Sequence, residues 1–209
     1  MPTCQCPVCK STDPRDNRLR ASVLIETDDG NNILIDCGPD FRQQALRADI
    51  KKLDALLITH IHFDHCAGLD DLRAYSFRNS LNTYAEDSVA ETFIKHYDYI
   101  FVHRYPGVPS VDLHRISPTD VIKVGNNEIV PIRVFHGKLP ILGYRIGPLA
   151  YITDCTGIAD EDWKKLEGID TLILDALRWH PHPTHWTVEQ AMEAVRRIKP
   201  RHTYFTHMS

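Results

Sequence analysis

Four side chains of types that commonly bind metals lie within six consecutive residues, in the run His-Ile-His-Phe-Asp-His. They are His60, His62, Asp64 and His65. Imidazole and carboxylate ligands together suit Zn²⁺, Mn²⁺ or Fe, and three histidines with one aspartate can serve two ions that share a site. The apolar stretch 53–59 predicts a strand that positions the loop after it. The run therefore predicts a metal site rather than a surface cluster of histidines.

This run, placed after a strand, resembles the His-X-His-X-Asp-His signature of the metallo-β-lactamase superfamily, and the resemblance covers nearly the whole chain. The superfamily pattern continues with a lone histidine, an aspartate after another strand and a last histidine after a late strand. This sequence has His136, Asp154 and His207 at those places. The resemblance implies that His60, His62 and His136 hold one metal, that Asp64, His65 and His207 hold a second, and that Asp154 bridges the two. It also implies a supporting role for Asp36.

Such an arrangement has a chemical purpose. Two metals about 3.5–4 Å apart can hold a hydroxide at neutral pH and neutralise charge on the oxygens of an in-line displacement. A bridging carboxylate such as Asp154 sets the separation of the metals. Each ligating histidine also needs an acceptor for its other ring nitrogen, for which Asp36 is a candidate. The ligand set therefore predicts a dinuclear metal hydrolase.

A second cluster lies near the N-terminus, where Cys4, Cys6 and Cys9 have a spacing suited to one tetrahedral Zn²⁺. This Cys-X-Cys-X-X-Cys pattern, together with the histidine run, resembles the phosphodiesterase of the bacterial carbon–phosphorus lyase pathway and its relatives. In that family a histidine three residues after the last active-site histidine completes a structural zinc site, and here that position falls beyond Ser209. The resemblance therefore implies a shortened chain with an incomplete zinc site and weakened sheet edges.

The segment before the last predicted helix holds a candidate proton donor, His185. Its position resembles the extra histidine that this phosphodiesterase family shares with tRNA 3′-processing endonucleases, where it is proposed to protonate the leaving oxygen. An imidazole suits that task because its pKa lies near neutral pH. His180 and His182 lie close by and are alternative candidates. His185 and the ligand Asp64 are accordingly the predicted catalytic residues.

The resemblance implies a phosphodiesterase that opens small cyclic phosphate esters by attack of a metal-held hydroxide. Three alternatives remain: a tRNA 3′-processing endonuclease, a thioesterase of the glyoxalase II kind, and a metal-binding module without catalysis. The net charge of −4, with no basic block, argues against a nucleic-acid partner. A thioesterase has no reason to keep His185 and the cysteine cluster, and a module without catalysis would lack a ligand. The expected substrate is a small phosphorylated molecule.

Composition sets the broad class of the protein. The 209 residues are 43% hydrophobic and 25% charged, which is ordinary for a globular protein, and we expect a single domain over 1–209 with a zinc-binding loop at 4–9. No apolar run is long enough to span a membrane, and cysteines stand where a secretory signal would be apolar. We therefore expect a cytoplasmic protein without a membrane partner.

Strands and helices recur in two successive groups. The sequence predicts a hairpin over 21–36, strands at 53–59, 81–85, 120–124, 128–135, 142–146, 149–153, 171–175 and 203–206, and helices at 41–49, 69–77, 87–99, 160–166 and 187–198. Two groups of strands, each followed by helices, fit an α/β fold of the αββα sandwich type, with two sheets face to face and helices outside, short of some terminal strands.

Overall fold

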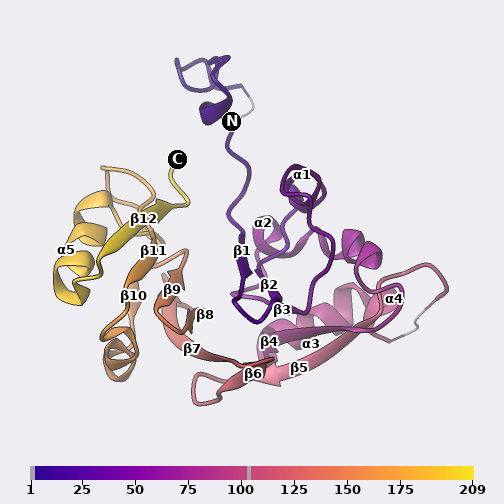
Figure 1. The fold of residues 1–209 in the computed structure, drawn as a ribbon. Coiled ribbons are helices and arrows are strands. Elements are labelled where there is room, and N and C mark those ends of the chain that lie inside the picture. Colours follow the sequence, from indigo (N-terminus) through magenta and orange to yellow (C-terminus); the bar gives the residue numbers. More distant parts are fainter. Residues whose placement is uncertain (1–2, 103–104) are drawn as a thin grey trace.

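The computed structural model describes residues 3–102 and 105–209, in which two mixed sheets face each other (Figure 1). The first sheet contains, in spatial order, β1 (Val23–Glu26), β2 (Asn32–Ile35), β3 (Ala55–Leu57), β4 (Leu81–Glu86) and β5 (Val111–Ile116). The second contains β10 (Gly157–Ile158), β7 (Asn127–His136), β8 (Leu139–Ile146), β9 (Leu149–Ile152), β11 (Thr171–Asp175) and β12 (His202–Thr206), with β6 (Ile122–Val124) also paired to β7.

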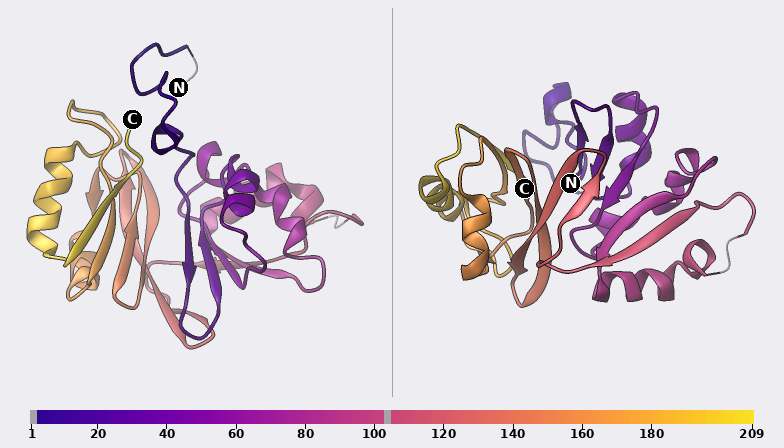
Figure 2. Two further views of the ribbon diagram at one scale, coloured as in Figure 1. Left: turned by 45° about the horizontal axis from the view of Figure 1, so that its top comes forward. Right: turned by 60° about the horizontal axis from the view of Figure 1, so that its bottom comes forward.

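Helices cover the outer faces of both sheets, as the two views of Figure 2 show. They are α1 (Phe41–Arg47), α2 (Phe63–Cys66), α3 (Asp87–His96), α4 (Asp98–Phe101) and α5 (Val188–Ile198), with 3-10 helices at Pro14–Asp16, Leu69–Ala74 and Asp160–Leu166. Within the described part of the chain, no helix is long and apolar enough to cross a membrane.

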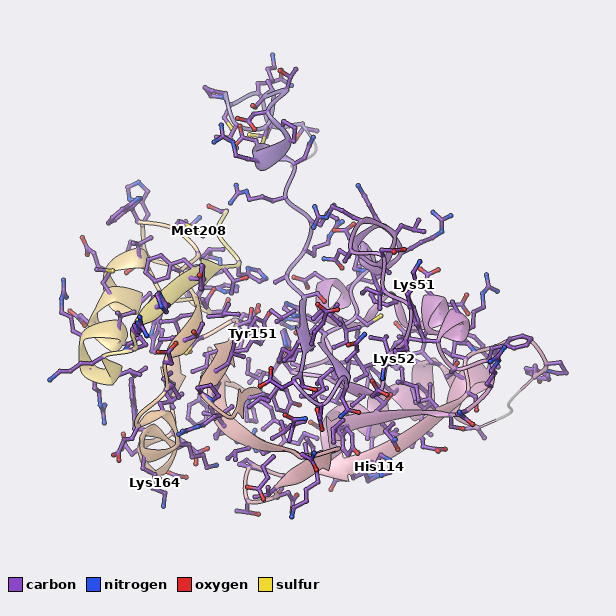
Figure 3. All side chains as sticks on the ribbon, in the orientation of Figure 1. Lys51, Lys52, His114, Tyr151, Lys164 and Met208 are labelled. Atoms are coloured by element: carbon purple, nitrogen blue, oxygen red, sulfur yellow. The ribbon has the colours of Figure 1, made fainter. Side chains whose placement is uncertain are left out.

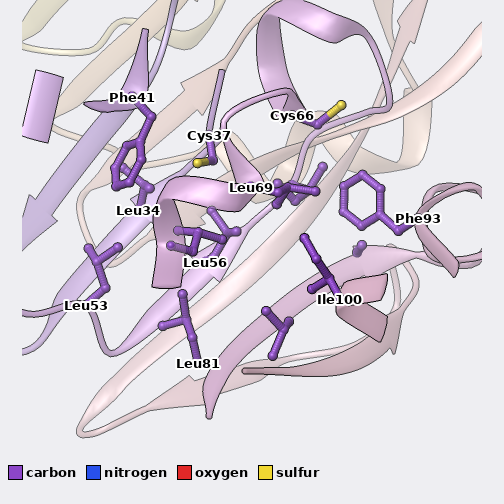
Figure 4. Close-up of a cluster of buried hydrophobic side chains, with 14 of the residues drawn as sticks. Leu34, Cys37, Phe41, Leu53, Leu56, Cys66, Leu69, Leu81, Phe93 and Ile100 are labelled. Carbon is purple, nitrogen blue, oxygen red and sulfur yellow. The ribbon is translucent and has the colours of Figure 1, made fainter. Parts of the chain in front are cut away.

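Alternation of buried side chains along the strands produces three apolar layers. Successive residues of a strand point to opposite faces of its sheet. Ile33 and Ile35 of β2 therefore pack in the layer between the sheets with Tyr151 of β9, which Figure 3 labels near the centre of the molecule. Leu34 points the other way, into the cluster under the helices of the first sheet (Figure 4). Ile152 points into a third layer, under α5. The predicted αββα sandwich is confirmed.

Local sequence signals account for the best-predicted elements. The hairpin pairs β1 with β2 in antiparallel register, with Val23 opposite Ile35, and its turn contains Gly30 at φ 79°. Helix α5 begins with a capping box in which Thr187 and Gln190 satisfy each other's backbone amides. The predictions over 21–36 and 187–198 are thus confirmed to within two residues at each end.

Other elements differ from the prediction. The segment expected to be a helix at 69–77 is a shorter 3-10 helix, Leu69–Ala74, and the helix expected at 87–99 divides into α3 and α4 at Tyr97, whose φ is −125°. Strand β5 was missed because its sequence, Val-Asp-Leu-His-Arg-Ile, is half polar and exposes Asp112, His114 and Arg115. Helix α2 and strand β10 were also missed, because elements of four and two residues are too short to show a period.

Candidate metal centre

All seven side chains predicted to bind the two metals come together where four strands end. His60 follows β3, His136 is the last residue of β7, Asp154 follows β9, and His207 follows β12. His62 is the N-cap of α2, and Asp64 and His65 lie within that helix. Residues far apart in the sequence are therefore positioned by the two sheets together.

Backbone conformation at the strand ends is unusual. Asp36, Asp154 and His207 have φ values of 63°, 51° and 57°, in the left-handed region that residues other than glycine rarely adopt. Each lies just past the end of a strand, where the chain turns into the site. Such backbone strain tends to persist at functional sites, where the surrounding fold enforces it.

A first group of ligand atoms comes from His60, His62, His136 and Asp154, and these atoms all lie within 4.8 Å of one another. The Nε2 atom of His60 is 3.0 Å from Nδ1 of His62. Asp154 Oδ1 is 3.9 Å from His60 Nε2 and 4.0 Å from His136 Nε2. Two imidazoles thus face one carboxylate oxygen of Asp154, and the ring of His62 completes the group.

Asp64, His65 and His207 supply a second group of ligand atoms, again within 4.8 Å of one another. Asp64 Oδ2 is 3.3 Å from Nε2 of both histidines. Asp154 also reaches this group, because its Oδ2 is 3.2 Å from His65 Nε2 and its Oδ1 is 3.5 Å from His207 Nε2. Asp154 therefore stands between the two groups, and the cluster suits a pair of metals that share this carboxylate.

The side chain of His65 tests whether cations fit here. Its Nδ1 lies 2.8 Å from Asp36 Oδ2 and donates to that carboxylate, while its buried Nε2 has no hydrogen-bond partner among the described residues. That Nε2 faces the carboxylates of Asp64 and Asp154. A ring nitrogen facing two carboxylates needs positive charge between them, either a proton on the ring or a metal ion, so the donor set fits a divalent metal.

Charge in the cluster leads to the same conclusion. Burial alone would raise the pKa of Asp154, but the hydrogen bond and charge of His65 hold it far below its usual range. Burial likewise opposes a charged His65, yet Asp36, Asp154 and Asp64 raise the pKa of His65 to about 12. Burial lowers the pKa of His60 well below its usual value, which leaves a neutral ring with a lone pair for a metal. Divalent cations would neutralise the same carboxylates whose negative charge otherwise stabilises the protonated ring of His65.

His185 lies beside the cluster on the segment before α5. Its Nε2 is 3.8 Å from Asp154 Oδ1, and its ring is stacked 4.9 Å from the ring of His207. Its Nδ1 is 3.3 Å from Oδ2 of Asp175, a carboxylate that also accepts from the backbone amide of Cys155.

The sequence prediction missed Asp175. A signal was available. Strand β11, Thr-Leu-Ile-Leu-Asp, ends in an aspartate after apolar residues, and so does the segment Ile-Leu-Ile-Asp that ends at Asp36.

The loop that carries His185 also contacts a metal-ligand candidate. His136 Nδ1 lies 2.6 Å from the backbone carbonyl oxygen of Thr184 and donates to it. His182 is close to His185, with ring centroids 5.1 Å apart, but its Nδ1 accepts from Thr184 instead of contacting Asp175. Of the three histidines proposed for the proton-donor role, His185 is thus buried beside the cluster and contacts a carboxylate there.

Two backbone segments approach closely beneath Asp64. Cys37 donates its amide to the carbonyl oxygen of His65 at 2.7 Å, and a Cβ added to Gly38 would lie 2.1 Å from the carbonyl oxygen of Asp64. Only glycine fits at that distance. The loop after β2 therefore supports the loop that carries the histidine run.

The cysteine cluster lies apart from this site. The sulfur atoms of Cys4, Cys6 and Cys9 all lie within 4.8 Å of one another, on an N-terminal loop that projects away from both sheets (Figure 1). The Cys9 amide and the neighbouring thiols lower the pKa of Cys6 to about 7. Three thiols at this spacing could bind one structural metal with a fourth position left for another ligand.

A model of the beta-lactamase superfamily domain matches residues 31–208. The chain belongs to the metallo-β-lactamase superfamily. This metallo-β-lactamase-fold chain is 42% identical to a crystal structure of a diphosphatase from the PhnP family, with a TM-score of 0.92 over 100% of this chain and 80% of the other. PhnP is the phosphodiesterase of the carbon–phosphorus lyase pathway that the cysteine and histidine patterns resemble, and this predicted kinship is confirmed.

Curated relatives are longer proteins. This superfamily member is 44% identical to a Porphyromonas gingivalis octanoyltransferase over 99% of its own length but only 42% of the relative. It is 27% identical to ribonuclease Z of Methanopyrus kandleri over 64% of its length and 46% of the relative. The chain thus spans less than half of these relatives. Human tRNase Z, short form, has a TM-score of 0.75 at 18% identity over 91% of this chain and 86% of that one, which shows a shared fold.

Proposed function

We propose that this chain is a metal-dependent hydrolase of small phosphate diesters, among them cyclic phosphates of ribose or nucleosides. His60, His62 and His136 would hold one divalent ion, Asp64, His65 and His207 would hold the other, and Asp154 would be shared by both. The observation that supports this most is the position of Asp154, whose two oxygens lie within 4 Å of histidines from both groups. Zn²⁺, Mn²⁺ and Fe²⁺ all accept this ligand set.

When bound, two such ions supply a water nucleophile at neutral pH and neutralise charge on the phosphate oxygens. The protein's own part is to fix the ligands and to move one proton. Asp175 accepts the Nδ1 proton of His185 and so holds the ring with its Nε2, the site of the second proton of an imidazolium, facing the cluster. His185 then donates that proton to the leaving oxygen, a step that matters most when the leaving group is a sugar hydroxyl.

A diphosphate linkage is a second candidate substrate, favoured by the 42% identity with the PhnP-family diphosphatase. In both a cyclic phosphate diester and a diphosphate, water attacks a phosphorus atom. The leaving groups differ: a diphosphate releases a phosphate monoester, which departs readily, whereas a cyclic diester releases an alkoxide, which needs a proton. Dependence on His185 therefore distinguishes them.

Other activities have weaker support. The likeness to ribonuclease Z extends over part of the chain, and the net charge of −4 is a poor match for a tRNA backbone. Thioester hydrolysis gives no role to the His185–Asp175 pair. Octanoyl transfer is the named activity of a relative of which this chain spans 42%. A non-catalytic module is disfavoured because no ligand of the cluster is missing.

A substrate panel tests the proposal. The zinc- and manganese-loaded protein is assayed on a nucleoside 2′,3′-cyclic phosphate, a dinucleoside diphosphate, bis-p-nitrophenyl phosphate, a thioester and a precursor tRNA. We expect turnover of the first three and none of the last two. Turnover of only the thioester or only the tRNA would overturn the proposal.

A further inference from the structure

One buried carboxylate contacts the two proposed metal sites by different routes. Asp36 is fully buried and lies just past the end of β2. It contacts His65 of the second site directly, with Oδ2 2.8 Å from Nδ1. It reaches His60 of the first site through Thr59, whose Oγ1 is 2.8 Å from Asp36 Oδ2 and 2.9 Å from His60 Nδ1.

Protons can be assigned to this chain of contacts in one way. The carboxylate of Asp36 only accepts, so the Thr59 hydroxyl donates to it, and the Thr59 amide donates to Oδ1 at 2.8 Å. Since the hydroxyl hydrogen is used, Thr59 Oγ1 can only accept from His60 Nδ1–H. With metals at the cluster, His60 and His65 would therefore both carry their proton on Nδ1 and present a bare Nε2 to the ions.

We propose that Thr59 is a positioning residue that extends the influence of Asp36 from the second metal site to the first. This inference rests on the metal assignment proposed above. It follows that changes at Thr59 and at Asp36 should affect the two metal sites unequally. Loss of the Thr59 hydroxyl frees the ring of His60 alone, whereas neutralising Asp36 disturbs a ligand of each metal.

Valine has nearly the same shape as threonine. Thr59→Val therefore removes the hydroxyl but keeps the hydrogen bond from the backbone amide of residue 59 to Asp36. Orienting partners of metal ligands typically contribute 10–100-fold to metal affinity. We therefore expect Thr59→Val to weaken one of the two stepwise metal affinities by roughly 10–100-fold and the other much less. Asp36→Asn should weaken both.

Metal affinities are measured without substrate, by competition with a chromogenic chelator for Zn²⁺, in a background in which Cys4, Cys6 and Cys9 are replaced by serine so that only the His/Asp cluster binds. Thr59→Ser keeps the hydroxyl and should restore the affinity that valine removes. Thr83→Val, at a fully buried threonine whose hydroxyl donates to the backbone carbonyl oxygen of Leu81, is the matched control and should change neither affinity. Unchanged affinities in Thr59→Val, or equal losses in the valine and serine variants, would overturn the inference. Failure of the wild-type protein to bind two ions at the cluster would instead overturn the proposed function.

A second measurement needs no variant of Thr59 and stands if that variant does not fold. In ¹⁵N spectra of the zinc-loaded wild-type protein, the rings of His60 and His65 should both carry a slowly exchanging proton on Nδ1. A His60 ring protonated on Nε2 would contradict the proton assignment and with it the role of Thr59.

Discussion

The two ligand clusters of this chain are built in opposite ways. The His/Asp cluster, which we propose binds two metals, draws its side chains from the ends of four strands, buries His60, His65 and Asp154, and supports its histidines through Asp36 and Thr184. The cysteine cluster takes three thiols from one short loop, with Cys6 and Cys9 exposed. A cluster of the first kind is organised by the whole fold before any metal arrives. A cluster of the second kind depends on the metal for its order.

Replacing Asp154, the carboxylate shared by both groups of histidines, should have the largest effect on activity. Asp154→Ala removes the group between the two sets of histidines, so we expect phosphodiester turnover to fall below detection. Circular dichroism should show that the fold is retained, because this carboxylate serves the metals more than the apolar layers. Asp160→Ala, at an exposed aspartate after β10, is the control and should be fully active. Wild-type rates in Asp154→Ala would contradict the ligand assignment.

Loss of His185 should produce a selective defect. Without a proton donor, hydrolysis of a ribose cyclic phosphate should slow by roughly 10²–10⁴-fold in His185→Ala. Hydrolysis of a p-nitrophenyl ester should slow much less, because its leaving group needs little protonation. kcat at saturating metal is the quantity to compare.

His182→Ala is the matched control, since His182 lies beside His185 without contacting Asp175. It should slow both substrates only slightly. Equal losses on the two substrates in His185→Ala would reject the acid role and leave the metal mechanism intact.

The smallest effect is expected at the cysteine loop. Cys6→Ser should reduce the zinc content by the single ion held on that loop and leave kcat unchanged, because the loop projects away from the sheets that position the active site. Metal content is measured by atomic emission alongside turnover. A large loss of turnover in Cys6→Ser would show that the two clusters are not independent.

The same contrast explains what could be predicted from the sequence. His60, His62, Asp64 and His65 are close together in the chain and match a motif, so their proximity required no knowledge of the fold. His136, Asp154 and His207 were identified because the resemblance to the superfamily asks for a histidine, an aspartate and a histidine after strands, and the strands were predicted from apolar runs. The αββα arrangement followed from the order of those runs.

Supporting residues were harder to predict. Thr59, Thr184 and Asp175 contact the cluster through hydrogen bonds whose geometry depends on how the sheets and the loop before α5 pack together. Nothing in the local spacing distinguishes Thr59 and Thr184 from other threonines, and the one available signal for Asp175 was its place at the end of an apolar strand. Strand β5 was missed for a related reason, since its polar residues hide the period of two that its pairing with β4 imposes.

Titration of the metal-free protein tests the central claim most directly. Zn²⁺ or Mn²⁺ is added stepwise to a variant with serine at positions 4, 6 and 9, and bound metal and phosphodiester turnover are followed together. The account predicts no turnover without metal, binding of two ions per chain, and full activity only when both are bound. Full activity in the metal-free protein, or saturation of activity and binding at one ion, would contradict it.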